Sequence, residues 1–145
     1  ETLGTGFKRM ADDMRDLIQG DENLKVIMRE FPILSEGSRF AARAALAARK
    51  QGKYEEFHFA LLRAKGRVNE QLTLVIAENV GIDVERLRAD MDGPEIQAHI
   101  DESRRLAEVL GVRGTPAFVV GSEFIPGAVS LSQLREAIEE ARKES

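Results

Sequence analysis

Cysteine is absent from this sequence of 145 residues, and so is tryptophan. Without a thiol the sequence offers no disulfide, no thiolate ligand for a metal ion and no cysteine nucleophile. Histidine occurs only at His58 and His99, and neither lies in a recognised spacing of metal ligands. We therefore expect no metal and no cofactor, while the cysteine count alone leaves the compartment open.

Charge of one sign and long apolar runs are lacking too. Acidic and basic residues are interleaved and leave a formal net charge of −4, so there is no basic face of the kind that binds nucleic acid. No apolar run approaches the length of a membrane span, and the opening ETLGTGFKRM has no apolar core of a signal peptide. The 43% hydrophobic and 32% charged residues are typical of one globular domain rather than a disordered chain.

Helical periodicity occupies most of the sequence, with start and stop signals between the segments. Ser38, Asn69 and Asp83 are expected to cap helices, and Ser130 with Gln133 forms a capping box. The predicted helices cover residues 8–19, 38–50, 53–65, 69–79, a short segment after Asp83, the stretch from Pro94 to Gly111, and residues 131–143.

Strand-type patterns occur in two places. Residues 24–30, LKVIMRE, predict a strand, and residues 116–120 with 123–125 predict a β-hairpin that turns at Gly121–Ser122. The two longer runs are apolar on both faces, which is typical of strands at the centre of a sheet covered by helices. Three strands are few for that much apolar surface, so we expect a further partner strand. The order of the elements indicates an α/β fold.

The most specific local motif is the segment Gly114–Phe118, GTPAF. A proline that opens an apolar strand has no N–H for the ladder at its own position. A cis bond before Pro116 would turn the preceding backbone outward and leave its groups open to another chain. Taken alone, the motif fits an ordinary proline between loop and strand better, because only about 5–6% of X–Pro bonds in folded proteins are cis.

Several stretches of the sequence together resemble one known family. They are REFPIL at 29–34, AARAALAA at 41–48, QGKY at 51–54, FH at 57–58, LGV at 110–112 and GTPAFVV at 114–120. Through nearly its whole length the chain is similar to the DsbA-like branch of the thioredoxin superfamily, especially to bacterial outer-membrane or secreted-protein disulfide isomerases. The resemblance implies a thioredoxin-like fold with an all-helical insertion, in which residues 1–36 and 111–145 form the thioredoxin-like domain and residues 37–110 the inserted helical domain.

In that family an apolar strand leads to a Cys-x-x-Cys motif at the start of the first helix. Here the two cysteines would flank Gly6 and Phe7, but neither they nor the preceding strand is present. Two interpretations stay open: the chain is redox-inactive, or the strand and thiols belong to a longer chain. An intact mass of 16.1 kDa would exclude the second interpretation. The resemblance also implies that Thr115 and Pro116 bind substrate.

The resemblance implies a thiol–disulfide oxidoreductase or isomerase that is periplasmic, in the cell envelope or secreted. Its partners would be cysteine-containing secreted proteins and a redox partner protein, with no nucleic acid and no membrane span, and nothing indicates an oligomeric state. The absence of cysteine favours a second hypothesis, a redox-inactive module that binds peptides or proteins through the same fold. A third is a glutathione-dependent relative that uses a hydroxyl, for which Thr5 is the only residue near the expected position.

Overall fold

The structure is a computed structural model that describes residues 5–32 and 35–145, with side chains from Lys8 onward. Contacts between residues divide the chain into two compact units. Among the described residues, one unit comprises Arg29–Arg105, and the other combines residues 5–28 with Leu106–Ser145. We call them the helical unit and the hairpin unit. The division predicted from the sequence, with residues 37–110 as an insertion, stays a prediction.

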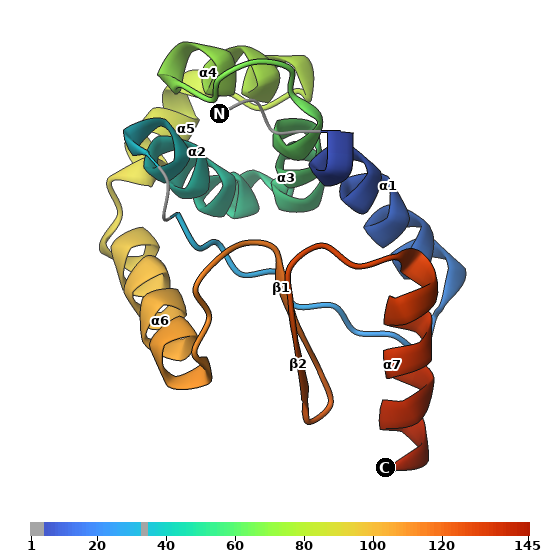
Figure 1. The fold of residues 1–145 in the computed structure, drawn as a ribbon. Helices are drawn as coiled ribbons and strands as arrows, with labels where there is room; N and C mark the ends of the chain where they lie inside the picture. Colours follow the sequence, from blue (N-terminus) through green and yellow to red (C-terminus); the bar gives the residue numbers. More distant parts are fainter. Residues whose placement is uncertain (1–4, 33–34) are drawn as a thin grey trace. The chain divides into compact units, whose positions relative to one another are not determined.

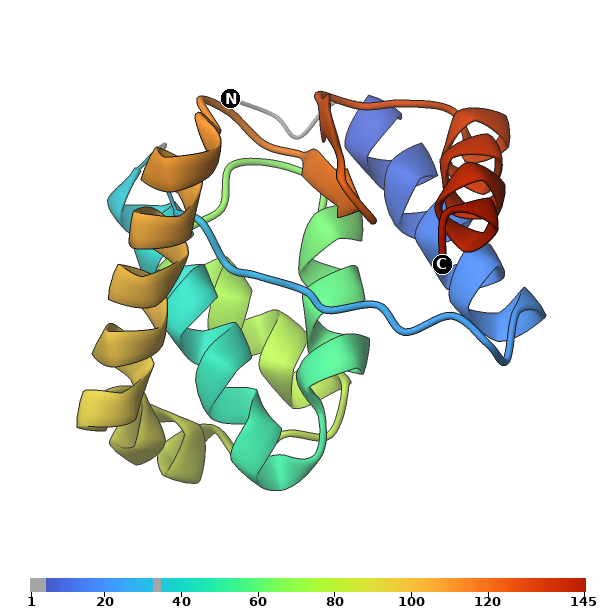
Figure 2. The same ribbon diagram turned by 90° about the horizontal axis from the view of Figure 1, so that it is seen from below.

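Short helices make up the helical unit (Figures 1 and 2). They are α2 (Glu36–Ala47), the 3-10 helix η1 (Ala48–Gln51), α3 (Tyr54–Arg63), α4 (Glu70–Asn79), α5 (Val84–Met91) and the first part of α6 (Pro94–Leu110). The alanine-rich α2 contacts α3, α4 and α5, because small side chains let three neighbours approach one helix. Phe57 and Leu87 are fully buried in this core.

Side-chain caps begin several of these helices. Asn69 and Asp83 each accept a hydrogen bond from the backbone N–H three residues later, at 2.8 and 3.1 Å, which confirms both predicted caps. The prediction of Ser38 as a cap is wrong. Ser35 caps α2, and its hydroxyl oxygen accepts the N–H of Ser38 at 3.2 Å. The backbone of Ser35 is extended, as a cap requires, whereas Ser38 already lies inside the first helical turn.

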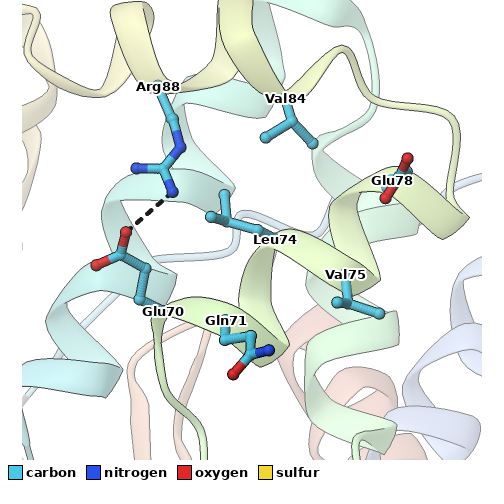
Figure 3. Close-up of a pocket in the computed structure, with 7 residues that line it drawn as sticks. All are labelled: Glu70, Gln71, Leu74, Val75, Glu78, Val84 and Arg88. Carbon is cyan, nitrogen blue, oxygen red and sulfur yellow. Dashed lines mark ion pairs between the residues drawn. The ribbon is translucent and has the colours of Figure 1, made fainter.

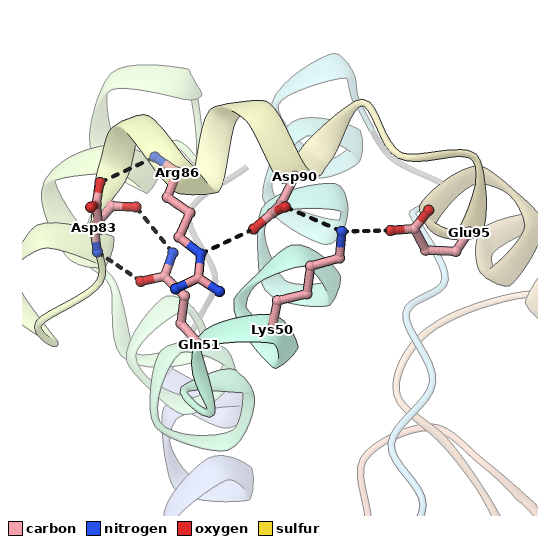
Figure 4. Close-up of polar contacts among 6 residues, drawn as sticks. All are labelled: Lys50, Gln51, Asp83, Arg86, Asp90 and Glu95. Atoms are coloured by element: carbon pink, nitrogen blue, oxygen red, sulfur yellow. Dashed lines mark hydrogen bonds and ion pairs between the residues drawn. The ribbon is translucent and has the colours of Figure 1, made fainter.

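A seam of polar contacts joins η1 to α5 and to the start of α6 (Figure 4). Gln51 exchanges two hydrogen bonds with the backbone of Asp83, at 3.1 and 2.9 Å. Lys50 contacts Asp90 at 3.1 Å and Glu95 at 2.9 Å. Hydrogen bonding to Glu95, and then to Asp90, raises the pKa of Lys50. Exposed ion pairs contribute little to stability, so the main effect of the seam is to fix which helix faces meet.

The hairpin unit combines two helices with a two-stranded sheet. The helices are α1 (Thr5–Gly20) and α7 (Leu131–Lys143), and the strands are β1 (Ala117–Val120) and β2 (Glu123–Pro126). The strands pair antiparallel with a two-residue turn, which confirms the predicted hairpin. α7 contacts both α1 and β1, so the helices cover one face of β1.

Apolar side chains from both helices and from β1 form the core of the hairpin unit. Phe118 and Val120 pack against a buried cluster of Met10, Leu17, Leu134 and Ile138. An ion pair also joins Arg142 of α7 to Asp21, which follows α1, at 2.7 Å. The hydrogen bond from Arg142 lowers the pKa of the Asp21 carboxyl.

The strand predicted at residues 24–30 is not formed. Among residues 5–32 and 35–145, only β1 and β2 pair into a sheet, and the segment runs extended without helix or strand (Figure 1). Ile27 is 68% exposed there. An alternating apolar pattern becomes a strand only where a neighbour supplies ladder hydrogen bonds. The further partner strand expected from the sequence is likewise not found among the described residues, and β1 is paired along one edge.

The capping box at the start of α7 allows a first prediction. The Ser130 hydroxyl accepts the N–H of Gln133 at 3.1 Å, and the Gln133 side chain accepts the N–H of Ser130 at 2.9 Å. We expect Ser130→Ala to lower the free energy of unfolding by about 1 kcal/mol, because it removes the acceptor for an N–H at the helix start. Urea denaturation measures this, with Ser130→Asp as the variant that keeps a cap. Equal stability of Ser130→Ala and the starting chain would contradict the assignment.

Candidate functional site

Thr115 and Pro116 lie in the hairpin unit, directly before β1, and the peptide bond between them is cis. Thr115 is exposed and Pro116 half-buried. The carbonyl of Pro116 accepts a hydrogen bond from the N–H of Gly127 at 2.9 Å. This bond continues the ladder by one step beyond the last strand pair, Ala117 with Pro126. Pro116 is therefore fixed to the sheet, while Thr115 is presented to solvent.

The register of the hairpin decides which backbone groups of β1 point away from β2. Val120 pairs with Glu123 across the turn, and pairs that exchange hydrogen bonds alternate with pairs that do not. Pro116 and Gly127 form a hydrogen-bonded pair, so every second pair along β1 from there is hydrogen-bonded as well. The N–H and C=O groups of Phe118 and Val120 therefore point toward β2. The N–H and C=O groups of Ala117 and Val119 then point to the opposite edge of β1. We call this edge, with Thr115 at its start, the open edge.

The open edge is also apolar. Val119 is 55% exposed, and its side chain lies on the face of the strand opposite to Phe118 and Val120. Within the described residues no strand pairs along this edge. N–H and C=O groups without a strand partner among the described residues, beside an exposed β-branched side chain, are a template for pairing with an extended segment, either the further strand that the sequence predicts or a bound chain.

The positions expected for the thiols lie at the start of α1. Gly6 and Phe7 belong to its first turn, but their side chains and that of Thr5 lie outside the described part. The backbone placement agrees with a motif at a helix N-terminus, where backbone N–H groups favour a negative charge. The residues themselves carry no thiol, since the sequence contains no cysteine.

A second cluster of polar residues lies in the helical unit. The sequence did not predict that these residues would meet. Oε1 of Glu30 accepts hydrogen bonds from the Tyr54 hydroxyl at 2.9 Å and from Nδ1 of His58 at 2.7 Å. Burial, and then the Glu30 carboxylate, raises the pKa of Tyr54. Tyr54 and His58 are four residues apart, so the sequence alone places both on one face of α3. Nothing in the sequence identifies Glu30 as their partner. No metal-type cluster is found among the residues described.

A shallow hollow on α4 and α5 has a volume of about 510 Å³. Figure 3 shows its lining and an ion pair between Glu70 and Arg88 at 3.0 Å across one end. Leu74, Val75 and Val84 give it an apolar floor. It contains no nucleophile, and one of its two carboxylates is already paired, so we assign no chemistry to it. The candidate site remains the open edge with Thr115 and Pro116.

Known proteins are similar to this chain in fold and in sequence. The chain matches the model of the DSBA-like thioredoxin domain over residues 8–139. It is 48% identical to a thioredoxin-like oxidoreductase from Silicibacter pomeroyi DSS-3, with a TM-score of 0.93, covering 100% of this chain and 84% of that one. It is 34% identical to the thiol-disulfide exchange protein alpha-DsbA2 from Wolbachia pipientis, with a TM-score of 0.87, covering 94% and 75%.

A different kind of relative is the Na(+)/H(+) antiporter NhaA 1 of Salinispora arenicola, 28% identical over 130 residues. The match covers 88% of this chain but 20% of that protein, so the chain spans about a fifth of the length of this curated relative. Among the helices that the structure describes, none is long and apolar enough to cross a bilayer. The family match and the solved structures confirm the predicted fold class, and the chain belongs to the family of DSBA-like thioredoxin domains.

Proposed function

We propose that this domain binds extended segments of cysteine-containing secreted proteins along the open edge, which is the substrate-binding half of thiol–disulfide exchange. The observation that carries the proposal is the alternation in β1, which directs backbone groups of Ala117 and Val119 away from β2. An added strand pairs with such groups through main-chain hydrogen bonds, and its alternate side chains find apolar contacts, here with Val119. Thr115 and Pro116 stand at the end of the edge where the bound segment would enter.

Exchange itself needs a thiolate that attacks a disulfide sulfur, forms a mixed disulfide and is released by a second thiol. The 145 residues contain no cysteine, so we propose that they bind without exchanging. Full oxidoreductase or isomerase activity is the second candidate, and it needs thiols flanking Gly6 and Phe7. The start of α1 supports that placement, because a helix N-terminus lowers the pKa of a thiol.

The compartment and the partners follow from the same chemistry. Disulfides persist in oxidising compartments, and the relative from Wolbachia pipientis is described as a thiol-disulfide exchange protein. We therefore propose a location in the periplasm or cell envelope or outside the cell. The proposed partners are unfolded or partly folded secreted proteins and, for a form that carries thiols, a redox partner protein.

A proline substitution tests the open edge. Val119→Pro removes an N–H that points away from β2, so the β1–β2 ladder keeps its bonds. We expect this variant to bind a short fluorescent peptide of alternating valine and threonine about tenfold more weakly than the starting chain, because one main-chain bond and its flanking contact are lost. Fluorescence anisotropy measures the affinity.

Val119→Thr is the matched control, because it keeps the N–H and a β-branched side chain. It should bind the peptide with an affinity within about threefold of the starting chain, a difference of less than about 1 kcal/mol. Circular dichroism checks that both variants keep the fold. Equal binding by the Val119→Pro and Val119→Thr variants would show that the peptide does not pair with the open edge, and absence of binding to the starting chain would refute the proposed function.

A further inference from the structure

Both histidines of the sequence lie in one polar network of the helical unit. Beyond the bonds of Glu30 to Tyr54 and His58, the guanidinium of Arg49 lies 4.7 Å from the centroid of the Tyr54 ring. Arg49 Nη1 also contacts Nε2 of His99 on α6 at 3.2 Å. We call these five residues the histidine network. It joins the segment before Pro32 to α3, α3 to η1, and η1 to α6.

The hydrogen bond between Arg49 and His99 requires a neutral His99. A guanidinium has donors and no acceptor, so Nε2 of His99 must be the acceptor. A histidine that accepts at Nε2 is neutral and carries its proton on Nδ1. If His99 gains a second proton, two donors and two positive charges face each other, and the bond is lost.

The charged groups around His99 shift its pKa in both directions. Burial, Arg49 of η1 and Arg29 of the extended segment disfavour the imidazolium, in that order, whereas Glu30 and Glu102 favour it. The sum lowers the pKa of His99 below its usual value. Protonation is then more favourable in the unfolded chain, so the contribution of His99 to stability is lost as the pH falls from about 6.5 through the lowered pKa.

The other end of the histidine network has a different hydrogen-bonding geometry. Glu30 accepts from His58 Nδ1 and from the Tyr54 hydroxyl, and both side chains of the Glu30–His58 pair are largely buried, with 15% and 18% exposed. A protonated His58 is still a donor to Glu30 and gains an opposite charge beside it. An added proton is therefore compatible with the bonds at this end and incompatible with the bond at His99.

We propose that the bond between Arg49 and His99 is an acid-released tie between η1 and α6. On acidification Arg49 leaves His99 and stays over the Tyr54 ring. The first part of α6 loses this tie to η1, while α3 keeps its bonds to the extended segment. Slightly acidic surroundings thus remove one polar contact between η1 and α6, leaving the contact from Lys50 to Glu95, and keep the bonds of α3 in place.

Two measurements test the tie. In a nuclear magnetic resonance titration, we expect the pKa of His99 to lie below its usual value of about 6.5. The pKa should rise in Arg49→Gln. In the control variant His58→Gln it should stay lower than in Arg49→Gln. Hydrogen exchange compares residues 94–105 with residues 54–63 near pH 7.5 and near pH 5. We expect protection of 94–105 to fall by at least about twofold on acidification and protection of 54–63 to persist. The difference should vanish in His99→Gln.

Each measurement can overturn the tie. A His99 that titrates at or above its usual value, or that titrates identically in Arg49→Gln, would show that Arg49 does not hold it neutral. Protection of residues 94–105 that is independent of pH, or that falls equally in His99→Gln, would show that α6 does not depend on this bond. Peptide binding at the open edge is measured separately, so failure of the tie leaves the proposed function standing.

Discussion

A chain that carries one inserted cysteine directly before Gly6 and another directly after Phe7 is expected to gain thiol–disulfide exchange, whereas the starting chain has none. The insertion places the thiols in the first turn of α1, where unpaired backbone N–H groups stabilise a thiolate. The first thiol can then attack a substrate disulfide, and the second can release the product. Reduction of a disulfide-bonded protein, with dithiothreitol as the electron donor, measures the gain over the uncatalysed rate.

The matched control inserts serine at the same two places. It changes the length of the chain in the same way but supplies no thiol, so we expect it to leave the rate at the uncatalysed level. If the cysteine variant folds, as judged by circular dichroism, and is also inactive, the start of α1 is not the position of the family motif. In that case the second candidate function is excluded for this domain.

The second large effect is expected from Gly37→Ala. Alanine usually favours a helix over glycine by about 1 kcal/mol, and Gly37 lies in the first turn of α2. A Cβ at this position, however, would overlap the backbone carbonyl of Val68. Because this neighbour is backbone, no side-chain rotation can relieve the overlap. We therefore expect a net loss of about 2 kcal/mol in the free energy of unfolding, because the backbone before α4 must shift. Urea denaturation with constant m-value measures it.

Gly20→Ala is the control, and we expect it to change the free energy of unfolding in the opposite direction. Gly20 ends α1, and a Cβ there meets no atom within 4 Å. We expect this variant to gain about 0.4–1 kcal/mol, since alanine restricts the unfolded chain more than glycine does. If Gly37→Ala stabilises the protein as much as Gly20→Ala, the close packing of α2 on the segment before α4 is wrong.

The helices could be predicted well because their signals are local. Asn69, Asp83 and Ser130 each cap a helix through an N–H three residues away, so the sequence contains both partners within one turn. The misplaced cap at Ser38 shows the limit of this reasoning. Ser35 and Ser38 are both suitable residue types, and only the extended backbone of Ser35 decides between them.

The strand predicted at residues 24–30 illustrates a different limit. Its pattern is local, but strand formation depends on a partner strand, which is often distant in sequence or part of another molecule. The hairpin could be predicted because its two strands are joined by a two-residue turn and supply each other with bonds. The pattern at 24–30 identifies apolar residues correctly and says nothing of what they pair with.

The candidate site was predictable in part. The sequence motif singled out Thr115 and Pro116, yet the open edge needed the register, since a shift of one residue would turn Ala117 and Val119 toward β2. The bonds of Glu30 to Tyr54 and His58 span 24 and 28 positions of the chain. Side-chain pairs at such separations depend on how α3 packs against the extended segment, which no local pattern specifies.

Amide hydrogen exchange within β1, with and without a saturating valine–threonine peptide, tests the central claim most directly. If the peptide adds as a strand, the N–H groups of Ala117 and Val119 become protected, while those of Phe118 and Val120, already bonded to β2, change little. Unchanged exchange at Ala117 and Val119 in the peptide-bound protein, or protection confined to other elements, would contradict binding at this edge.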